Sequence, residues 1–375
     1  MRSFLLTLLI LFFSVQISLA YTAKKNIKVG IITNADSFSA AATDIFFVSD
    51  ADDKKYKLSK GMTTLTAVEK GFKMRNFILK PPIKIESTNG IIFADKKPYR
   101  GFLTVIKFNS RAVVINVLTV EDYLKGVLPK EANPGWGTEA LKTQAVASRT
   151  YTLANMGRHD SMGFDMCDTT HCQVYGGAAW ESLSCNIAIA ETKSEVLTYD
   201  AKLAQAVFHA NCGGHTEDPK YVWGWTNATV EYLKGVKCGY CGNAPHTHWE
   251  TTLSENFIIQ KLSKYGVGKI KSIEVKDVTP AGSAMEVTIR HSKGMFDMNA
   301  YKFRLAVDAW KIKSTTFDDI KKDGDKITFK GRGWGHKVGL CQWGAKAMAD
   351  EGKKYKQILE HYYPKTKVEK VTYQQ

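Results

Sequence analysis

The spacing of apolar residues predicts that the first quarter of the chain is rich in β-strands. Residues 25–97 contain short runs of β-branched and aromatic residues separated by polar turns, and the run at 26–33 is the clearest. Such runs are typical of strands bounded by turns. Two further strands are expected at 83–86 and 91–93, as a hairpin about the Asn89-Gly90 pair. We interpret this portion as a wall-binding or scaffolding module.

A second hairpin and a buried helix are predicted next. Two β-branched runs, 103–108 and 112–118, are joined across Asn109-Ser110. The alanine-rich segment at about 138–156 is apolar nearly all the way round, which predicts a buried helix. Later strands and helices show neither a fixed repeat nor regular βαβ alternation. The expected fold class is therefore α+β, a strand-rich mixed fold containing a buried alanine-rich helix.

The first twenty residues resemble a secretory signal peptide. Arg2 precedes an apolar run at 4–15, and Ser18-Leu19-Ala20 places small residues at the cleavage positions. We expect cleavage after Ala20, so that the mature protein begins at Tyr21 and is exported to the periplasm or cell envelope. The alternative is an uncleaved segment, which would then be the only contact with a membrane.

The net charge of the chain indicates which classes of partner it could bind. The chain has 52 Lys and Arg residues against 37 Asp and Glu residues, a net charge of +15. A basic surface attracts anionic partners, such as nucleic acid, anionic lipid or acidic wall polymers. The basic residues are spread along the chain without a nucleic-acid-binding motif, so we do not expect nucleic acid as a partner.

Glu131 is the candidate catalytic residue. It lies between Pro129 and Pro134, just before Trp136 and the predicted buried helix. Each proline fixes its own φ and restricts the residue before it, so the sequence predicts a stiff turn. Rigid placement is what a general acid requires. The alternative is an ordinary solvated loop carboxylate.

Two groups of cysteine and histidine residues are candidates for metal binding. Cys167, His171 and Cys172 lie within six residues, and His159 is the nearest fourth donor, so the set could close on one tetrahedral Zn²⁺. Four protein ligands would make that zinc structural. A disulfide involving Cys167 or Cys172 is the alternative.

The second group is the Cys238-Gly239-Tyr240-Cys241 motif, with His246 and His248 close behind and Cys212 upstream. It could form a structural disulfide or a second metal clip, and the sequence leaves both open. The chain has seven cysteines, so they cannot all pair internally as disulfides.

Several ordered blocks resemble the stage II sporulation protein D (SpoIID) family, which includes the LytB amidase enhancers. The resemblance covers about residues 99–364, and its blocks lie at 121–131 with 139–151, 167–175, 208–217 and 331–345. It implies peptidoglycan lytic transglycosylase chemistry with Glu131 as the acid/base. We therefore expect a signal peptide at 1–20, a strand-rich portion at 21–98 and a SpoIID-like catalytic domain at 99–375.

The resemblance also implies the other site residues. Some family members hold zinc through a similar Cys-then-His-Cys cluster with an upstream histidine, and here the metal would fix the loop that presents Gln173 and Tyr175. Arg149, in the buried helix, needs either an internal ion pair or an anionic or sugar ligand, and the resemblance favours the ligand. The glycines and tryptophans of the later blocks suit the walls of a glycan groove. The expected glycan-contacting residues are Arg149, Gln173, Tyr175, Gly213, Gly214, Thr216, Trp334, His336 and Gln342.

Two functions are consistent with these residues. The first is a lytic transglycosylase that cleaves the MurNAc–GlcNAc bond of peptidoglycan glycan strands, with a preference for strands stripped of stem peptides. The second is a non-catalytic wall protein that binds and stimulates an N-acetylmuramoyl-L-alanine amidase. A third and weaker alternative is a metalloamidase with a catalytic zinc, because no HExxH-type motif provides an open metal site.

Overall fold

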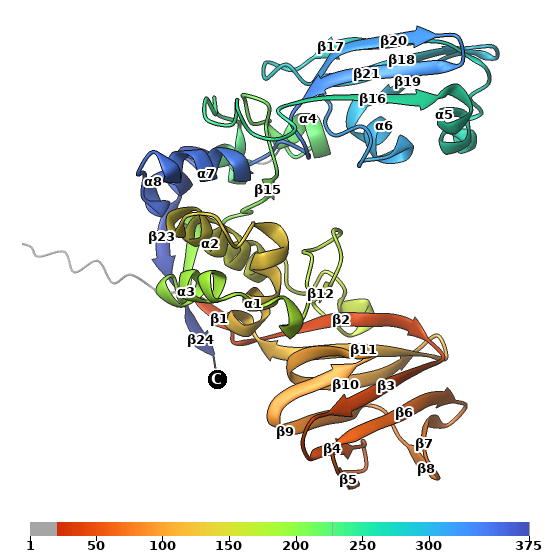
Figure 1. Cartoon of the computed structure of the whole chain (residues 1–375), viewed down its shortest axis with the longest axis vertical. Coiled ribbons are helices and arrows are strands. Elements are labelled where there is room, and N and C mark those ends of the chain that lie inside the picture. Colours follow the sequence, from red (N-terminus) through yellow and green to blue (C-terminus); the bar gives the residue numbers. More distant parts are fainter. Residues whose placement is uncertain (1–20, 227, 375) are drawn as a thin grey trace, which may run out of the picture.

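The computed structural model describes residues 21–226 and 228–374, arranged as three parts along the long axis of the molecule (Figure 1). An N-terminal sheet lies at one end, a group of helices lies in the middle, and a second β-rich module lies at the other end. The expected signal peptide falls outside the described residues. None of the helices in the described part of the chain is long and apolar enough to cross a membrane.

The N-terminal part is one twisted sheet, which confirms the strand-rich expectation. Its main strand order is β12-β2-β11-β10-β9-β3-β6-β7-β8, with β4 paired to β9 and β5 paired to β4. The strands are β2 (Asn26–Ala35), β3 (Ser37–Ala42), β4 (Phe46–Ser49), β5 (Lys55–Leu58), β6 (Gly61–Val68), β7 (Gly71–Met74), β8 (Phe77–Leu79), β9 (Ile83–Ala94), β10 (Lys97–Phe108), β11 (Arg111–Thr119) and β12 (Met166–Cys167).

One of the two predicted hairpins is confirmed and the other is wrong. β10 and β11 pair across Asn109 and Ser110, whose φ values of 47° and 64° suit a tight hairpin turn. The pair Asn89-Gly90 does not reverse the chain, because β9 continues through it and turns back only after Ala94. Buried side chains on both sides of Gly90 keep the strand on the sheet. The expected 98/99 boundary lies within β10, so both sides of it share one sheet.

The middle part is built around the predicted buried helix. Helix α2 (Thr138–Ala154) has 12 buried residues out of 17, which confirms the expectation. The other elements here are α1 (Val120–Glu131), α3 (Leu183–Glu191), α4 (Pro219–Trp223), α7 (Gln342–Asp350), α8 (Tyr355–Tyr362), β13 (Glu195–Tyr199), β14 (Lys202–Leu203), β15 (Phe208–His209), β22 (Leu340–Cys341) and β23 (Lys367–Lys370). Helix α2 packs against α1, α3, α7, α8 and β13.

The C-terminal module lies between β15 and β22 in the sequence, and those two strands pair in parallel. Its own hydrophobic core includes Trp249, Phe303 and Phe329. Its elements are β16 (His248–Ser254), α5 (Glu255–Lys261), β17 (Ile270–Val278), β18 (Ala284–His291), β19 (Gly294–Asn299), α6 (Ala300–Val307), β20 (Phe317–Asp323) and β21 (Lys326–Arg332).

The two ends of the described chain also meet. β1 (Thr22–Lys24) pairs in parallel with β24 (Thr372–Gln374) beside the middle part (Figure 1). Sheets made largely from local hairpins, together with a separate group of helices, make the whole chain a strand-rich α+β fold, as expected.

Candidate active site

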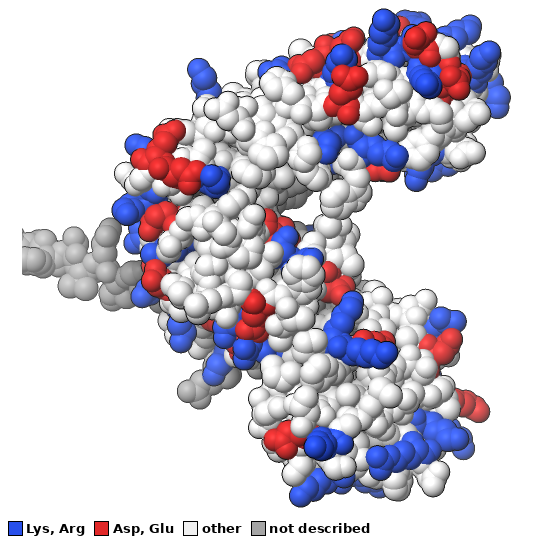
Figure 2. Space-filling view, in the orientation of Figure 1, with Lys and Arg blue, Asp and Glu red and all other residues white. Residues whose placement is uncertain are grey.

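A cavity of about 1060 Å³ lies where the middle part faces the C-terminal module. Figure 2 shows the molecule hollowed between its two β-rich ends, with Lys and Arg residues scattered among Asp and Glu over this face. The lining comes from the ends of α1 and α2, the loop 169–174, the segment 205–208, the region of α4, helix α6 and His336. The cavity therefore joins segments that lie far apart in the sequence.

Glu131 lies in the wall of this cavity as the last residue of α1. The predicted stiff turn is wrong, because the helix continues through Pro129. Thr119 caps the first turn by accepting a hydrogen bond from the amide of Asp122, and one face of the helix is buried. Pro129 lies in the last turn, where it removes a single helical hydrogen bond. A helix end, rather than a turn between prolines, fixes the position of Glu131.

The surroundings of Glu131 suit a general acid. The backbone amide of Val174 donates to Oε1 at 3.0 Å, and the side-chain amide of Gln342 donates to the Glu131 carbonyl oxygen at 3.0 Å. Burial raises the pKa of Glu131 above its ordinary value, although the Val174 amide and Lys130 act in the opposite direction. Among the described residues that line the cavity, Glu131 is the only carboxylate.

The four predicted metal ligands come together beside Glu131. The ligand atoms of His159, Cys167, His171 and Cys172 all lie within 4.8 Å of one another. Cys172 Sγ is 3.3 Å from His159 Nε2 and 3.5 Å from His171 Nδ1. Two sulfurs and two imidazole nitrogens at this spacing fit one tetrahedral Zn²⁺. Cys172, the last residue of the cluster, lies two residues before Val174, whose amide donates to the Glu131 carboxyl group.

An aromatic wall also lines the cavity, and of its four residues only His336 was expected from the sequence. Trp223 packs against Trp225 at 4.7 Å, His336 at 4.9 Å and Tyr301 at 6.4 Å between ring centroids. All four side chains line the cavity. The density of aromatic residues between Tyr221 and Trp225 was the signal that could have identified α4. Faces of this kind suit the apolar faces of sugar rings.

Two polar side chains of the cavity differ in charge. Burial lowers the pKa of His336 to about 4, with a smaller contribution from Arg304, so its ring is neutral at neutral pH. Arg158 is exposed at the cavity, and its Nη1 donates to the Tyr151 hydroxyl at 2.9 Å. Arg158 therefore offers a cation to the ligand, whereas His336 offers a neutral hydrogen-bonding ring.

Comparison with known proteins places this architecture in a family. A model described as stage II sporulation protein matches residues 109–199, and a model of a domain of unknown function matches residues 243–339. Stage II sporulation protein D of Bacillus amyloliquefaciens is 30% identical over 66% of this chain and 73% of its own length. The chain belongs to the stage II sporulation protein D family. The expected resemblance is thereby confirmed.

Two further proteins are similar to this chain. An uncharacterised protein of Brachyspira hyodysenteriae is 39% identical over 71% of this chain and 70% of that protein. A protein named amidase enhancer, from Bacillus subtilis, is 30% identical over 86% of this chain. The match covers only 51% of that enhancer's length.

Arg149 is a structural residue of this SpoIID protein, and the expected sugar contact is corrected. Its side chain is fully buried, and Nε and Nη2 pair with the two Glu121 oxygens at 3.0 and 2.8 Å. Nη1 donates to the Glu195 carbonyl oxygen at 3.1 Å, and Nη2 also donates to that of Ile189 at 3.2 Å. These partners occupy the guanidinium, so the internal ion pair was the correct alternative.

Gln173 and Tyr175 are also buried. Contact with the glycan was expected for both, but neither lines the cavity. Gln173 Oε1 accepts from the Thr152 hydroxyl at 2.7 Å, and the Tyr175 hydroxyl donates to Asn116 Oδ1 at 2.8 Å. Through these hydrogen bonds both side chains attach the loop 169–174 to the protein interior. Between them, Val174 lines the cavity and points its amide at Glu131.

The two glycine-rich loops pack against each other, and their glycines do not line the cavity. A Cβ on Gly213 would lie 3.0 Å from the Gly333 nitrogen, and a Cβ on Gly333 would lie 2.7 Å from the Asn211 carbonyl oxygen. Asn211 and Trp334 form a β-bridge at this point. These glycines permit close backbone packing, which corrects the expectation that they admit a glycan. The cavity-lining residues do not include Gly213, Gly214, Thr216 and Trp334.

Thr216 and Trp334 have structural partners instead. The Thr216 hydroxyl accepts from the Val236 amide at 2.7 Å, and Trp334 packs against Trp310, His246 and Lys313. The side-chain amide of Gln342 donates to the Glu131 carbonyl oxygen, as described above, and also to Gln144 Oε1 at 3.3 Å. Of the expected glycan-contacting residues, only His336 lines the cavity.

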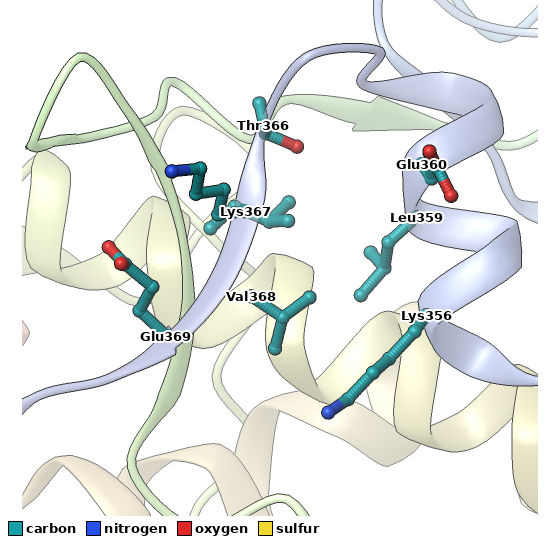
Figure 3. A pocket seen from close by; sticks show the side chains of 8 residues that line it. Lys356, Leu359, Glu360, Thr366, Lys367, Val368 and Glu369 are labelled. Atoms are coloured by element: carbon teal, nitrogen blue, oxygen red, sulfur yellow. The ribbon is translucent and has the colours of Figure 1, made fainter. Parts of the chain in front are cut away.

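A smaller cavity of about 430 Å³ lies between α8 and β23 (Figure 3). Lys356, Leu359 and Glu360 approach it from the helix, and Thr366 to Glu369 approach it from the strand segment. Its described lining residues include none of the candidate site residues, so we place the chemistry in the larger cavity.

Proposed function

We propose that this SpoIID protein is a lytic transglycosylase that cleaves the MurNAc–GlcNAc bond of peptidoglycan. The observation that carries the proposal is the single carboxylate, Glu131, among the described residues lining the large cavity. Ordinary glycosidases require two carboxylates, because an external water or an enzyme nucleophile must act on the opposite face of the sugar. A lytic transglycosylase requires one, because its nucleophile belongs to the substrate.

One carboxyl group completes the reaction. Glu131 donates its proton to the glycosidic oxygen as the bond from C1 of MurNAc to that oxygen breaks. The C6 hydroxyl of the same MurNAc attacks C1, an intramolecular step with a high effective molarity. The carboxylate then takes the hydroxyl proton, which regenerates the acid and leaves 1,6-anhydro-MurNAc. The raised pKa of Glu131 favours the protonated form that begins this cycle.

Other cavity residues suit a stripped glycan strand. Removal of a stem peptide exposes the lactyl carboxylate of MurNAc, and the exposed Arg158 offers that carboxylate a planar cation. Trp223, Trp225 and Tyr301 provide faces for sugar rings. Zn²⁺ bound by the four His and Cys residues would have a closed shell and would hold the loop without taking part in the chemistry.

We also propose that residues 1–20 direct export and that the mature protein acts in the cell envelope. The sequence of this segment and the names of the relatives support this location.

The test compares the wild type with Glu131→Gln on purified, peptide-stripped glycan. Glutamine keeps the shape and the hydrogen bond from Val174 but cannot donate the proton. Cleavage should fall by roughly a hundredfold to ten-thousandfold while glycan binding persists. Mass spectrometry of the products should show abundant 1,6-anhydro-MurNAc ends from the wild type and few or none from Glu131→Gln. Glu69→Gln, in the exposed turn between β6 and β7, is the matched control and should cleave normally.

A second candidate function is stimulation of a cell-wall amidase, favoured by the identity to the amidase enhancer over most of this chain. Here the purified protein would raise the rate at which an N-acetylmuramoyl-L-alanine amidase releases stem peptides from intact wall. Glu131→Gln would stimulate as well as the wild type, and neither protein would form anhydro ends. That result would reject the transglycosylase.

A further inference from the structure

A second cluster of metal-binding side chains lies in the middle part, away from the cavity. Cys212, Cys238, Cys241 and Cys341 place their sulfur atoms within 4.8 Å of one another, and all four are buried. They are free thiols in this structure. Cys212, Cys238 and Cys241 were grouped from the sequence, whereas Cys341 joins them only through the parallel pairing of β15 with β22.

The spacing fits a single ion. Zinc–thiolate bonds of about 2.3 Å in a tetrahedron place the sulfurs about 3.8 Å apart. Cys212 Sγ and Cys241 Sγ are 3.5 Å apart, and all four sulfur atoms lie within 4.8 Å of one another. Small shifts of the side chains would therefore bring the sulfur atoms to the spacing that zinc requires. Gly239 lies between the two cysteines of the CxxC motif with φ of +72°, a conformation that lets the chain turn back between them.

Hydrogen-bond donors lie close to two of these sulfur atoms. The amides of Cys212 and Gly344 donate to Cys341 Sγ at 3.3 and 3.4 Å, the second of them at the start of α7. The Tyr362 hydroxyl lies 3.1 Å from Cys238 Sγ. Burial lowers the pKa of Lys337, and negative charge on Glu217 and Cys212 acts in the opposite direction. Hydrogen-bond donors offset the net negative charge of a metal bound by four thiolates.

We propose that Cys212, Cys238, Cys241 and Cys341 bind one structural Zn²⁺. Thiolate-only tetrahedral sites select zinc or iron–sulfur centres, and the compact spacing favours one zinc ion. Four protein ligands leave no open position, so the ion has no direct part in catalysis. The inference stands on these four residues alone and does not depend on the proposed transglycosylase activity.

The position of the cluster indicates what the ion does. The domain-of-unknown-function match, residues 243–339, begins just after Cys241 and ends just before Cys341. The ion would therefore fasten both the entry and the exit of the C-terminal module to the middle part. Tyr301 and His336 belong to that module, so the ion would fix the orientation of one wall of the cavity.

The test counts metal ions and thiols in the full exported chain, isolated without reductant from zinc-replete medium. Cys341→Ser should contain about one zinc fewer per chain than the wild type, whereas Cys185→Ser should lose none. Cys185 is the matched control, because it is buried in α3 outside both clusters. An equal zinc content in Cys341→Ser and the wild type would overturn the proposal.

Two measurements remain informative if Cys341→Ser does not fold. In Cys172→Ser, which disables the His and Cys cluster, X-ray absorption at the zinc edge should show four sulfur neighbours at about 2.3 Å. Alkylation of the denatured, unreduced wild type in the presence of a chelator should label all seven cysteines. Labelling of only Cys167, Cys172 and Cys185 would show two disulfides in place of the metal. Iron in place of zinc would also overturn the assignment.

Discussion

At the scale of single residues, the site depends on one carboxyl group, Glu131, whose surroundings have two opposing effects on its ionisation. Glu131 keeps a donor on one oxygen, from Val174, while burial opposes its ionisation. Its neighbours therefore hold the position of the group without fixing it as a carboxylate. This balance favours a group that gives up a proton and then takes one back.

The raised pKa of Glu131 predicts how stability depends on pH. The folded chain holds this proton more tightly than the unfolded chain, for which the ordinary value is 4.5. The resulting stabilisation is fully present below that pH and is lost as pH rises through the raised pKa. Glu131→Gln cannot ionise and avoids the loss. The free energy of unfolding of the variant, relative to the wild type, should therefore increase as pH rises above 4.5.

Urea unfolding across a pH series measures this difference. Glu69→Gln provides the comparison, because its side chain is exposed and should show no such increase. A difference between Glu131→Gln and the wild type that stays constant with pH would show that burial does not raise the pKa.

At the scale of elements, three segments position Glu131. Helix α1 carries it, the N-terminus of α7 supports its backbone through Gln342, and the loop 167–174 provides the amide of Val174. Only the loop lacks regular secondary structure over most of its length. Its anchors are the buried Gln173 and Tyr175 and the proposed metal.

Removal of the metal from the His and Cys cluster should therefore reduce activity through the loop. We expect Cys167→Ser to lose about one zinc and to cleave roughly tenfold to hundredfold more slowly, since a displacement of about 1 Å can cost that much. Amide exchange in 167–175 should become faster. Cys185→Ser should change none of these quantities. Zinc loss with unchanged cleavage and exchange would separate the cluster from the catalytic site.

Sequence patterns predicted the features that depend on nearby residues. The spacing of His159, Cys167, His171 and Cys172 was sufficient to anticipate their meeting, because thirteen residues of chain separate the first from the last. The hairpin of β10 and β11 was equally local, since its turn residues and alternating apolar positions lie side by side.

Features that depend on packing between distant elements were not predictable in the same way. The burial of Arg149 was expected, but its partner Glu121 follows from how α1 packs on α2. Cys341 lies 129 residues from Cys212, and only the pairing of β15 with β22 joins them. The contact between Gly213 and Gly333 is likewise visible only in three dimensions.

At the scale of the whole molecule, the cavity exists because two parts with separate cores face each other. The middle part contributes Glu131, and the C-terminal module contributes Tyr301 and His336. A long polymer can enter such an open groove from the side, whereas a closed pocket would admit only a chain end. The architecture therefore suits a substrate such as a glycan strand.

The aromatic wall should contribute to binding rather than to chemistry. In the inactive Glu131→Gln background, Trp223→Ala should weaken binding of stripped glycan about two- to tenfold, as expected for loss of one aromatic contact. Trp310→Ala is the control, because Trp310 is 70% exposed and does not line the cavity. Equal affinities for the Trp223→Ala protein and its parent would place the glycan elsewhere.

The pairing of β1 with β24 has a consequence for the order of assembly. Thr22–Lys24 leave the ribosome before the other described strands, yet their partners, Thr372–Gln374, leave it 350 residues later. If the chain crosses a membrane from its N-terminus, the first strand reaches the far side and waits there unpaired until translocation ends. The pairing beside the middle part can therefore form only after nearly all of the described chain has been delivered, and the lytic activity proposed above would be delayed until then if it depends on this pairing.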